Sequence, residues 1–167
     1  WARFAALAEA GCDAADVIFY LTARDGETLY RDAPDGQALI PLAPFLNRTD
    51  LPDQTKGSGP MLSVGMMRKG DKFASYRLIA DALAALPVGN WRLQIAGDGP
   101  IRADVERLMA PFGKRVTFLG ALGADDLTAA YLGSSLLFWP GVNEAFGLVY
   151  LEAQAHGLPV VAQDRPG

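Results

Sequence analysis

The sequence has one cysteine, one histidine and no long apolar run, and each shortage excludes a class of protein. A lone Cys12 allows no disulfide within the chain, which favours a reducing compartment. With His156 as the only histidine, the chain has neither a His-rich metal centre nor a Ser-His-Asp triad with a spare base. No apolar run approaches the ~20 residues that a membrane helix needs. We therefore expect a cytoplasmic protein without a membrane span.

The chain has 167 residues, of which 50% are hydrophobic and 20% are charged, with a formal net charge of -4. This composition predicts a folded core, and its acidic balance argues against nucleic acid or an anionic membrane as the main partner. The charge surplus lies in residues 1–60, which hold five Lys/Arg against nine Asp/Glu. Within this range, residues 47–60 form a polar segment rich in Pro and Gly. We expect a first domain over residues 1–46, a linker over 47–60 and a second domain over 61–167.

Hydrophobic spacing predicts alternating strands and helices in the second domain. Strands are expected at residues 61–67, 91–96, 115–119, 136–139 and 159–162, and helices at 72–86, 101–112, 125–132 and 146–156. Before the linker, helices are expected at 1–10 and 24–31, a strand at 16–21, and a short extended segment at 39–42 that Pro41 and Pro44 keep from a central position. The fold class is α/β, a Rossmann-like doubly wound parallel sheet that is incomplete at its C-terminal end. Because no targeting pattern is visible and the first residue is Trp1, we expect further chain upstream.

Two glutamates eight positions apart, Glu144 and Glu152, follow the strand at 136–139. At the helical rise of 1.5 Å per residue their spacing is about 12 Å, too long for a glycosidase pair but suited to the two ends of one elongated ligand. The helix that starts between them presents backbone amides at Phe146, Gly147 and Leu148, where a phosphate would fit. The alternative interpretation is that Glu144 caps this helix and that Glu152 is a solvated surface residue.

Basic residues follow the strand at 61–67: Arg68, Lys69 and Lys72 could neutralise a diphosphate, or form a solvated basic turn. Gly97-Asp98-Gly99-Pro100 lacks the glycine pattern of a dinucleotide site, so we interpret it as a turn before a helix. His156 is interpreted as a structural helix-end residue and Cys12 as a small core residue. The sequence contains no Asp-x-Asp pair, so no metal is expected at the site.

The ordered series of segments from Val64-Gly65 onward resembles the C-terminal, donor-binding half of GT-B-fold retaining glycosyltransferases, the group that includes sucrose synthase. The segments are Val64-Gly65, Arg68 to Lys72, Leu93 to Pro100, Val116 to Gly120, Glu144 to Gly147, Glu152-Ala153 and Gly157 to Val161. The resemblance covers residues 61–167 and makes residues 1–46 the tail of an acceptor-binding domain. It implies a metal-independent transferase that uses a nucleotide-sugar donor. The acceptor would be a glycan, a lipid or a small molecule, with any membrane contact made only through the missing domain.

The resemblance also implies roles by position. Glu144 would contact the donor sugar, Glu152 the ribose, and Lys72 a phosphate, with Glu144, Lys72 and Arg68 as the catalytic set. The amides of Phe146, Gly147 and Leu148 would bind the sugar and the distal phosphate. Phe118 and Leu119 would offer backbone atoms to the nucleobase, and Gly65 and Gly97 complete the expected donor-binding residues.

Two positions depart from the family pattern. Met66 stands where an arginine commonly follows the first glycine, so Arg68 would have to supply that charge. The family's lysine is followed by glycine, which is true of Lys69 and not of Lys72; we favour Lys72 because it directly precedes the helix pattern. The alternatives are a sugar-nucleotide-binding module without turnover and, on the same type of sheet, a dinucleotide-dependent oxidoreductase.

Overall fold

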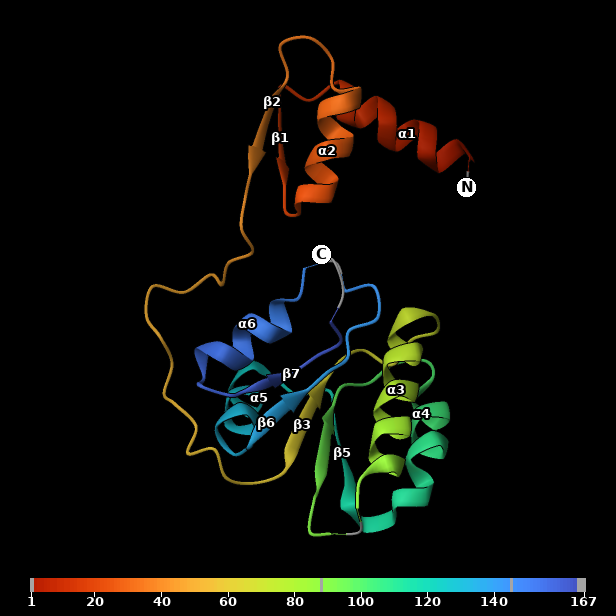
Figure 1. The fold of residues 1–167 in the computed structure, drawn as a ribbon, viewed down its shortest axis with the longest axis vertical. Coiled ribbons are helices and arrows are strands. Elements are labelled where there is room, and N and C mark those ends of the chain that lie inside the picture. Colours follow the sequence, from red (N-terminus) through yellow and green to blue (C-terminus); the bar gives the residue numbers. More distant parts are fainter. Residues whose placement is uncertain (1, 88, 145, 165–167) are drawn as a thin grey trace. The chain divides into compact units, whose positions relative to one another are not determined.

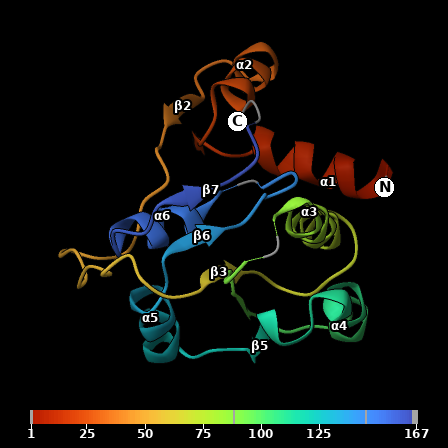
Figure 2. The same cartoon turned by 60° about the horizontal axis from the view of Figure 1, so that its bottom comes forward.

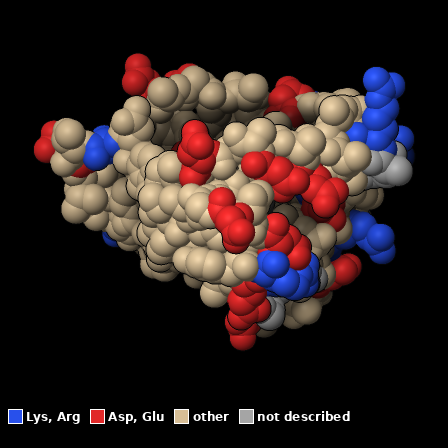
Figure 3. All heavy atoms as spheres, turned by 90° about the horizontal axis from the view of Figure 1, so that it is seen from above, with Lys and Arg blue, Asp and Glu red and all other residues tan. Residues whose placement is uncertain are grey.

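A computed structural model describes residues 2–87, 89–144 and 146–164. The chain divides into two compact units, one within residues 1–45 and one over residues 46–164 (Figure 1). Residues 165–167, the end of the expected second domain, lie outside the described residues. On the face that Figure 3 shows, Asp and Glu side chains (red) are spread widely. Lys and Arg side chains (blue) form a few separate groups there.

The first unit consists of α1 (Ala2–Asp13), β1 (Val17–Tyr20), α2 (Ala23–Asp32) and β2 (Ala38–Pro41). β1 and β2 pair in parallel, with Val17 opposite Ala38. α2 begins after Thr22, whose side chain accepts a hydrogen bond from the backbone N–H of Asp25 at 3.1 Å. The expected strand, helix and extended segment are all present. The interpretation of Cys12 as a core residue is wrong, because its side chain is exposed on α1.

The second unit contains a five-stranded parallel sheet. Its elements are β3 (Met61–Val64), α3 (Asp71–Ala85), β4 (Leu93–Ala96), α4 (Arg102–Met109), η1 (Ala110–Arg115), β5 (Val116–Gly120), α5 (Ala124–Leu132), β6 (Leu136–Phe138), α6 (Leu148–Ala155) and β7 (Val160–Val161). The strand order is β5-β4-β3-β6-β7. α3 and α4 cover one face of the sheet, and α5 and α6 cover the other (Figure 2). This arrangement confirms the doubly wound α/β fold.

The order of strands reverses between β3 and β6. From β3 the chain moves outward through β4 to β5, and then returns across the sheet to place β6 beside β3 on the other side. Right-handed crossovers require the helices to change face at that return, as they do. Such a reversal leaves a crevice between two strands at their carboxyl ends, where open α/β sheets bind ligands.

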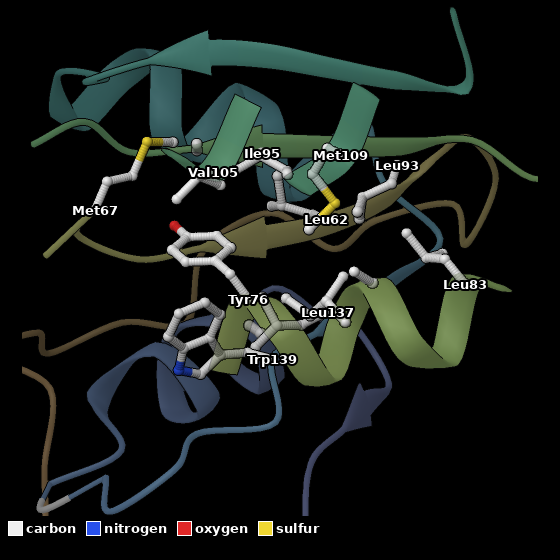
Figure 4. Packing of buried hydrophobic residues seen from close by; sticks show 14 of the residues in the cluster. Leu62, Met67, Tyr76, Leu83, Leu93, Ile95, Val105, Met109, Leu137 and Trp139 are labelled. Carbon is white, nitrogen blue, oxygen red and sulfur yellow. The ribbon is translucent and has the colours of Figure 1, made fainter. Parts of the chain in front are cut away.

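The core of the second unit joins the central strands to α3 and α4 (Figure 4). Leu62, Ile95 and Leu137 come from neighbouring strands and are fully buried. On α3, the buried residues recur at the helical spacing that the sequence predicts: Ser75, Tyr76, Ile79, Ala80 and Leu83. The Tyr76 hydroxyl donates a hydrogen bond to the Gly65 carbonyl at 2.7 Å, so this side chain ties α3 to the end of β3.

The segment expected as a linker, residues 47–60, is fastened to the second unit along part of its length. The backbone N–H of Thr55 donates to the His156 carbonyl at 2.8 Å, and its hydroxyl lies within 3.0 Å of the Leu132 and Ser134 carbonyls. Gln54 donates to the Ala155 carbonyl at 2.8 Å. A Pro/Gly-rich composition predicted the lack of regular structure here but not these attachments.

Replacing Leu62 by Ala tests the core. Because Leu62 is fully buried in the central strand, we expect the free energy of unfolding of the second unit to fall by about 2–5 kcal/mol. Leu51→Ala is the matched control, because Leu51 is 79% exposed, and it should change this quantity by less than about 0.5 kcal/mol. Urea unfolding of both variants gives the comparison, and equal losses would contradict the assigned core.

Candidate functional site

A cavity of about 530 Å³ opens at the carboxyl ends of the strands, where the strand order reverses. The ends of β3, β4, β5 and β6 and the helices α3, α5 and α6 contribute to its wall. The lining consists of Val64, Gly65 and Met66 after β3, Ala96, Gly97 and Asp98 after β4, Ala121, Leu122 and Leu127 around the start of α5, Trp139, Glu144 and Phe146 after β6, Leu148, Val149 and Glu152 on α6, and Lys72 on α3. The cavity is therefore assembled from most elements of the second unit.

Two glycines in the cavity wall allow neighbouring elements to pack closely. Gly97 has a φ of 142°, and a Cβ there would collide with the backbone carbonyl of Gly65. A Cβ on Gly65 would lie 2.5 Å from the Trp139 ring. The ends of β3 and β4 therefore approach each other and Trp139 more closely than any residue with a side chain permits.

Lys72 and Glu144 form an ion pair inside the cavity. The Nζ of Lys72 lies 2.6 Å from Oε2 of Glu144, and the two side chains are only 16% and 20% exposed. The indole N–H of Trp139 donates to the same oxygen at 3.2 Å. Burial alone would raise the pKa of Glu144, but the hydrogen bonds from Lys72 and Trp139, with the attraction of Lys72 and Arg68, lower it. Glu144 is thus a carboxylate within a site that also holds a cation.

The loop between β6 and α6 is anchored from both sides, so Glu144 has a defined position. The backbone N–H of Val142 donates to the Ser75 hydroxyl of α3 at 2.9 Å, and Asn143 donates to Asp71 at 3.2 Å. On the other side, the Tyr150 hydroxyl of α6 donates to the Trp139 carbonyl at 3.2 Å. Burial raises the pKa of Tyr150 to about 12, with a smaller contribution from the negative charge of Glu144.

α6 begins at Leu148, two residues later than the sequence suggests. Gly147 is the residue before the helix and has a left-handed φ of 63°, so Phe146 precedes the helix and is 58% exposed. Among the described residues no side chain caps this helix, and the Glu144 carboxylate is bonded to Lys72 and Trp139 instead, so the interpretation of Glu144 as a helix cap is wrong. Ala145 of the same motif lies outside the described residues.

Glu152 occupies the α6 wall of the cavity. The Tyr131 hydroxyl of α5 donates to its Oε2 at 2.8 Å, and the side chain is half-buried, which contradicts the interpretation of a solvated surface residue. Burial, and then the negative charge of Glu152, raise the pKa of Tyr131. His156 follows the last turn of α6, stacks on Tyr131 with ring centroids 4.9 Å apart, and places Nδ1 2.7 Å from the Glu152 carbonyl oxygen. The interpretation of His156 as a structural helix-end residue is confirmed.

The cavity brings together most of the residues that the sequence singles out. Its walls include Lys72, Glu144, Glu152, Gly65, Gly97, Phe146 and Leu148. Lys69 and Arg68 are exposed and outside the lining, although Arg68 is near enough to act on the charge of Glu144. Gly147 adjoins the wall as the residue before α6.

Phe118 and Leu119 lie within β5, and the wall beside that strand is made by Ala121 and Leu122 instead. Gly97-Asp98-Gly99-Pro100 is a turn before a helix, as predicted. Asp98 accepts from the Gly99 N–H at 2.7 Å and from Arg102 at 2.8 Å, and these contacts lower its pKa. The sequence analysis did not identify Tyr131 as a site residue. The feature that could have indicated it is a tyrosine hydroxyl within the apolar pattern of α5.

Within residues 2–87, 89–144 and 146–164, no group of three or more His, Cys, Asp or Glu side chains is placed to hold a metal ion. No helix in this part of the chain combines the length and the apolar character that crossing a bilayer requires.

Comparison with known proteins gives matches along most of the second unit. Residues 61–167 match the family described as "Glycosyl transferases group 1". A sulfoquinovosyl transferase of Arabidopsis thaliana is 39% identical over 88 residues, which are 53% of this chain and 16% of that protein.

Two solved structures share the fold. Sucrose-phosphate synthase from Thermosynechococcus elongatus has a TM-score of 0.72 at 23% identity, over 92% of this chain and 42% of that one. The pneumococcal O-GlcNAc transferase GtfA, in complex with UDP and GlcNAc, has a TM-score of 0.66 at 20% identity, over 91% of this chain and 31% of that one. The chain spans less than half the length of each of these three proteins.

Replacing Glu144 by Gln tests the ion pair through the pH dependence of stability. Because the pKa of Glu144 in the folded chain is below its ordinary value of 4.5, its carboxylate stabilises the fold above that pH, and the contribution is lost as the pH falls through the lowered pKa. We expect the difference in unfolding free energy between wild type and Glu144→Gln to be constant near neutral pH and to shrink below pH 4.5.

Thermal or urea unfolding over a pH series measures this difference. Glu106→Gln is the control, because Glu106 pairs with Arg102 on the exposed side of α4, where an ion pair contributes little. A Glu144→Gln difference of the same size at every pH would refute the stabilising role of the carboxylate.

Proposed function

The chain belongs to the group 1 glycosyl transferases, and on that premise we propose that its second unit binds a nucleotide-sugar donor and serves sugar transfer to an acceptor with retention of configuration. The observation that carries the proposal is the placement of Lys72 and Glu144 in one part of the wall and Glu152 on α6, within a single cavity at the strand-order reversal. Such a cavity suits a ligand with a carbohydrate end, a charged middle and a nucleoside end.

Each charged group matches a part of such a donor. Glu144 would accept hydrogen bonds from sugar hydroxyls, and Lys72 would bind a phosphate of the donor. Glu152, already fixed by Tyr131, would accept from the ribose hydroxyls. The backbone N–H groups at Gly147 and Leu148 stand at the start of α6, where a helix favours an anion. The pneumococcal O-GlcNAc transferase GtfA was solved in complex with UDP and GlcNAc, which fits this class of donor.

The proposed reaction exchanges one bond to the anomeric carbon of the sugar for another. The bond from that carbon to the distal phosphate oxygen breaks, and a bond to the acceptor oxygen forms on the same face. The acceptor proton passes to the departing diphosphate, so no protein base is required. Lys72, aided by Arg68 and the start of α6, would stabilise the negative charge that develops on the diphosphate, in place of a metal ion.

A panel of nucleotides tests donor binding. UDP, GDP, ADP, their glucose or mannose esters and NAD are compared at one common concentration. One nucleoside diphosphate and its sugar ester should stabilise the fold, by about 2.7 kcal/mol once that concentration is about 100 times the dissociation constant, and NAD should not. Thermal shift measures the effect, which we expect to be unchanged by EDTA. Stabilisation by NAD alone would favour an oxidoreductase, and a strict need for magnesium would contradict metal-independent binding.

Variants of the two glutamates test the division of roles. Glu152→Gln should weaken binding of the nucleoside diphosphate and of its sugar ester alike, by about tenfold, because both carry the ribose. Glu144→Gln should weaken only the sugar ester, since it replaces the charged carboxylate acceptor for sugar hydroxyls by a weaker amide and frees Lys72 for phosphate. Titration calorimetry measures both affinities, with Glu106→Gln as the control on α4. Parallel losses for both ligands in both glutamate variants would contradict this assignment.

A further inference from the structure

The indole of Trp139 contacts both members of the ion pair. Its N–H donates to Oε2 of Glu144 at 3.2 Å, and the Nζ of Lys72 lies 5.3 Å from the centroid of its ring. A lysine ammonium at that distance from an indole face is attracted by the ring quadrupole. The same oxygen of Glu144 therefore receives one donor from Lys72 and one from Trp139, while the ring holds Lys72 from a second direction.

Trp139 itself has little freedom to move. It is fully buried, and its ring meets that of Tyr76 edge to face, with centroids 5.3 Å apart (Figure 4). The ring packs so closely on Gly65 that no side chain fits there. Its backbone is fixed as well, because its N–H donates to the Val161 carbonyl at 3.1 Å and its carbonyl accepts from Tyr150. The indole is thus held by β3, α3, β7 and α6 at once.

A fixed indole limits how Lys72 and Glu144 can rearrange. Around Glu144 the charged and titratable groups are Lys72 on α3, Arg68 before α3 and Tyr150 on α6. With Lys72 and Glu144 alone, a ligand phosphate that drew Lys72 away would leave the carboxylate without a donor. The Trp139 N–H remains bonded to Glu144 in that event, so the carboxylate keeps its place while Lys72 exchanges its partner.

We propose that Trp139 is a positioning residue for the donor: its ring face holds Lys72 toward the diphosphate and its N–H holds Glu144 toward the sugar. The inference rests on the proposed function and deepens it, because it assigns two separable effects to two parts of one side chain. Loss of the N–H affects recognition of the sugar, and loss of the ring affects binding of the phosphates as well.

Two substitutions separate these effects. Trp139→Phe removes the N–H and keeps an aromatic face, so affinity for the nucleoside diphosphate should stay within about twofold while affinity for its sugar ester falls by about tenfold. Trp139→Leu removes both, so both affinities should fall. The ligands are the UDP, GDP or ADP pair that stabilises the wild type most, with affinities measured by calorimetry. Equal changes for both ligands in Trp139→Phe, or no change in either variant, would overturn the proposal.

Trp91→Phe is the matched control. Trp91 packs on Phe112 and Arg115, away from the residues that line the cavity, and should leave both affinities unchanged. A loss of sugar preference in Trp91→Phe as well would show that the effect comes from general destabilisation, and would count against a specific role of Trp139.

A measurement without ligand uses the wild-type fold and covers the case in which the Trp139 variants fail to fold. The indole ¹H–¹⁵N resonances of the three tryptophans are followed by NMR as the pH falls. One resonance should shift with a midpoint below pH 4.5, and this step should vanish in Glu144→Gln and persist in Trp91→Phe. Absence of the step would overturn the contact between Trp139 and Glu144. If the wild type binds none of the nucleotides, the proposed function fails, whereas the indole titration still decides whether Trp139 holds Glu144.

Discussion

The reversal of strand order between β3 and β6 is the constraint on which the rest of the second unit depends. Right-handed crossovers oblige α3 and α4 to cover one face and α5 and α6 the other, so the segments after β3 and β6 diverge and leave a space between them. Glycine at positions 65 and 97 allows the ends of β3 and β4 and the Trp139 ring to pack closely beside that space. The cavity is therefore a consequence of topology, and side chains decide what it can hold.

Charge inside this cavity is organised by contacts between elements that are distant in sequence. Lys72 on α3 meets Glu144 after β6, 72 positions later, and Tyr131 on α5 meets Glu152 on α6. Each carboxylate thus has a donor from a different helix, which fixes its direction before any ligand arrives. A preorganised carboxylate loses less conformational entropy when it binds a hydroxyl.

The sequence predicted the alternation of strands and helices and the main charged residues, because both depend on local patterns. Apolar runs and the helical spacing on α3 are properties of neighbouring residues. The start of α6 differs from the predicted start at residue 146 because Gly147, with its left-handed backbone, ends the loop there. The contacts of Thr55 and Tyr131 could not be predicted from the sequence, because each joins segments that become neighbours only in the folded chain. The contact between the Trp139 N–H and Glu144 could not be predicted either, since nothing in the local sequence of Trp139 indicates it.

The ion pair between Lys72 and Glu144 has a consequence for the order of events in the cavity. An anionic ligand that approaches Lys72 competes with a carboxylate only 2.6 Å away, so the pair lowers the affinity for a simple anion. A ligand with both an anion and a hydroxyl donor offers each member of the pair a new partner. Its phosphate would bind Lys72, and its hydroxyl would donate a hydrogen bond to Glu144. In the proposed donor complex, a sugar hydroxyl would replace Lys72 as a hydrogen-bond donor to Glu144, so the pair would favour a phosphate joined to a sugar over free phosphate.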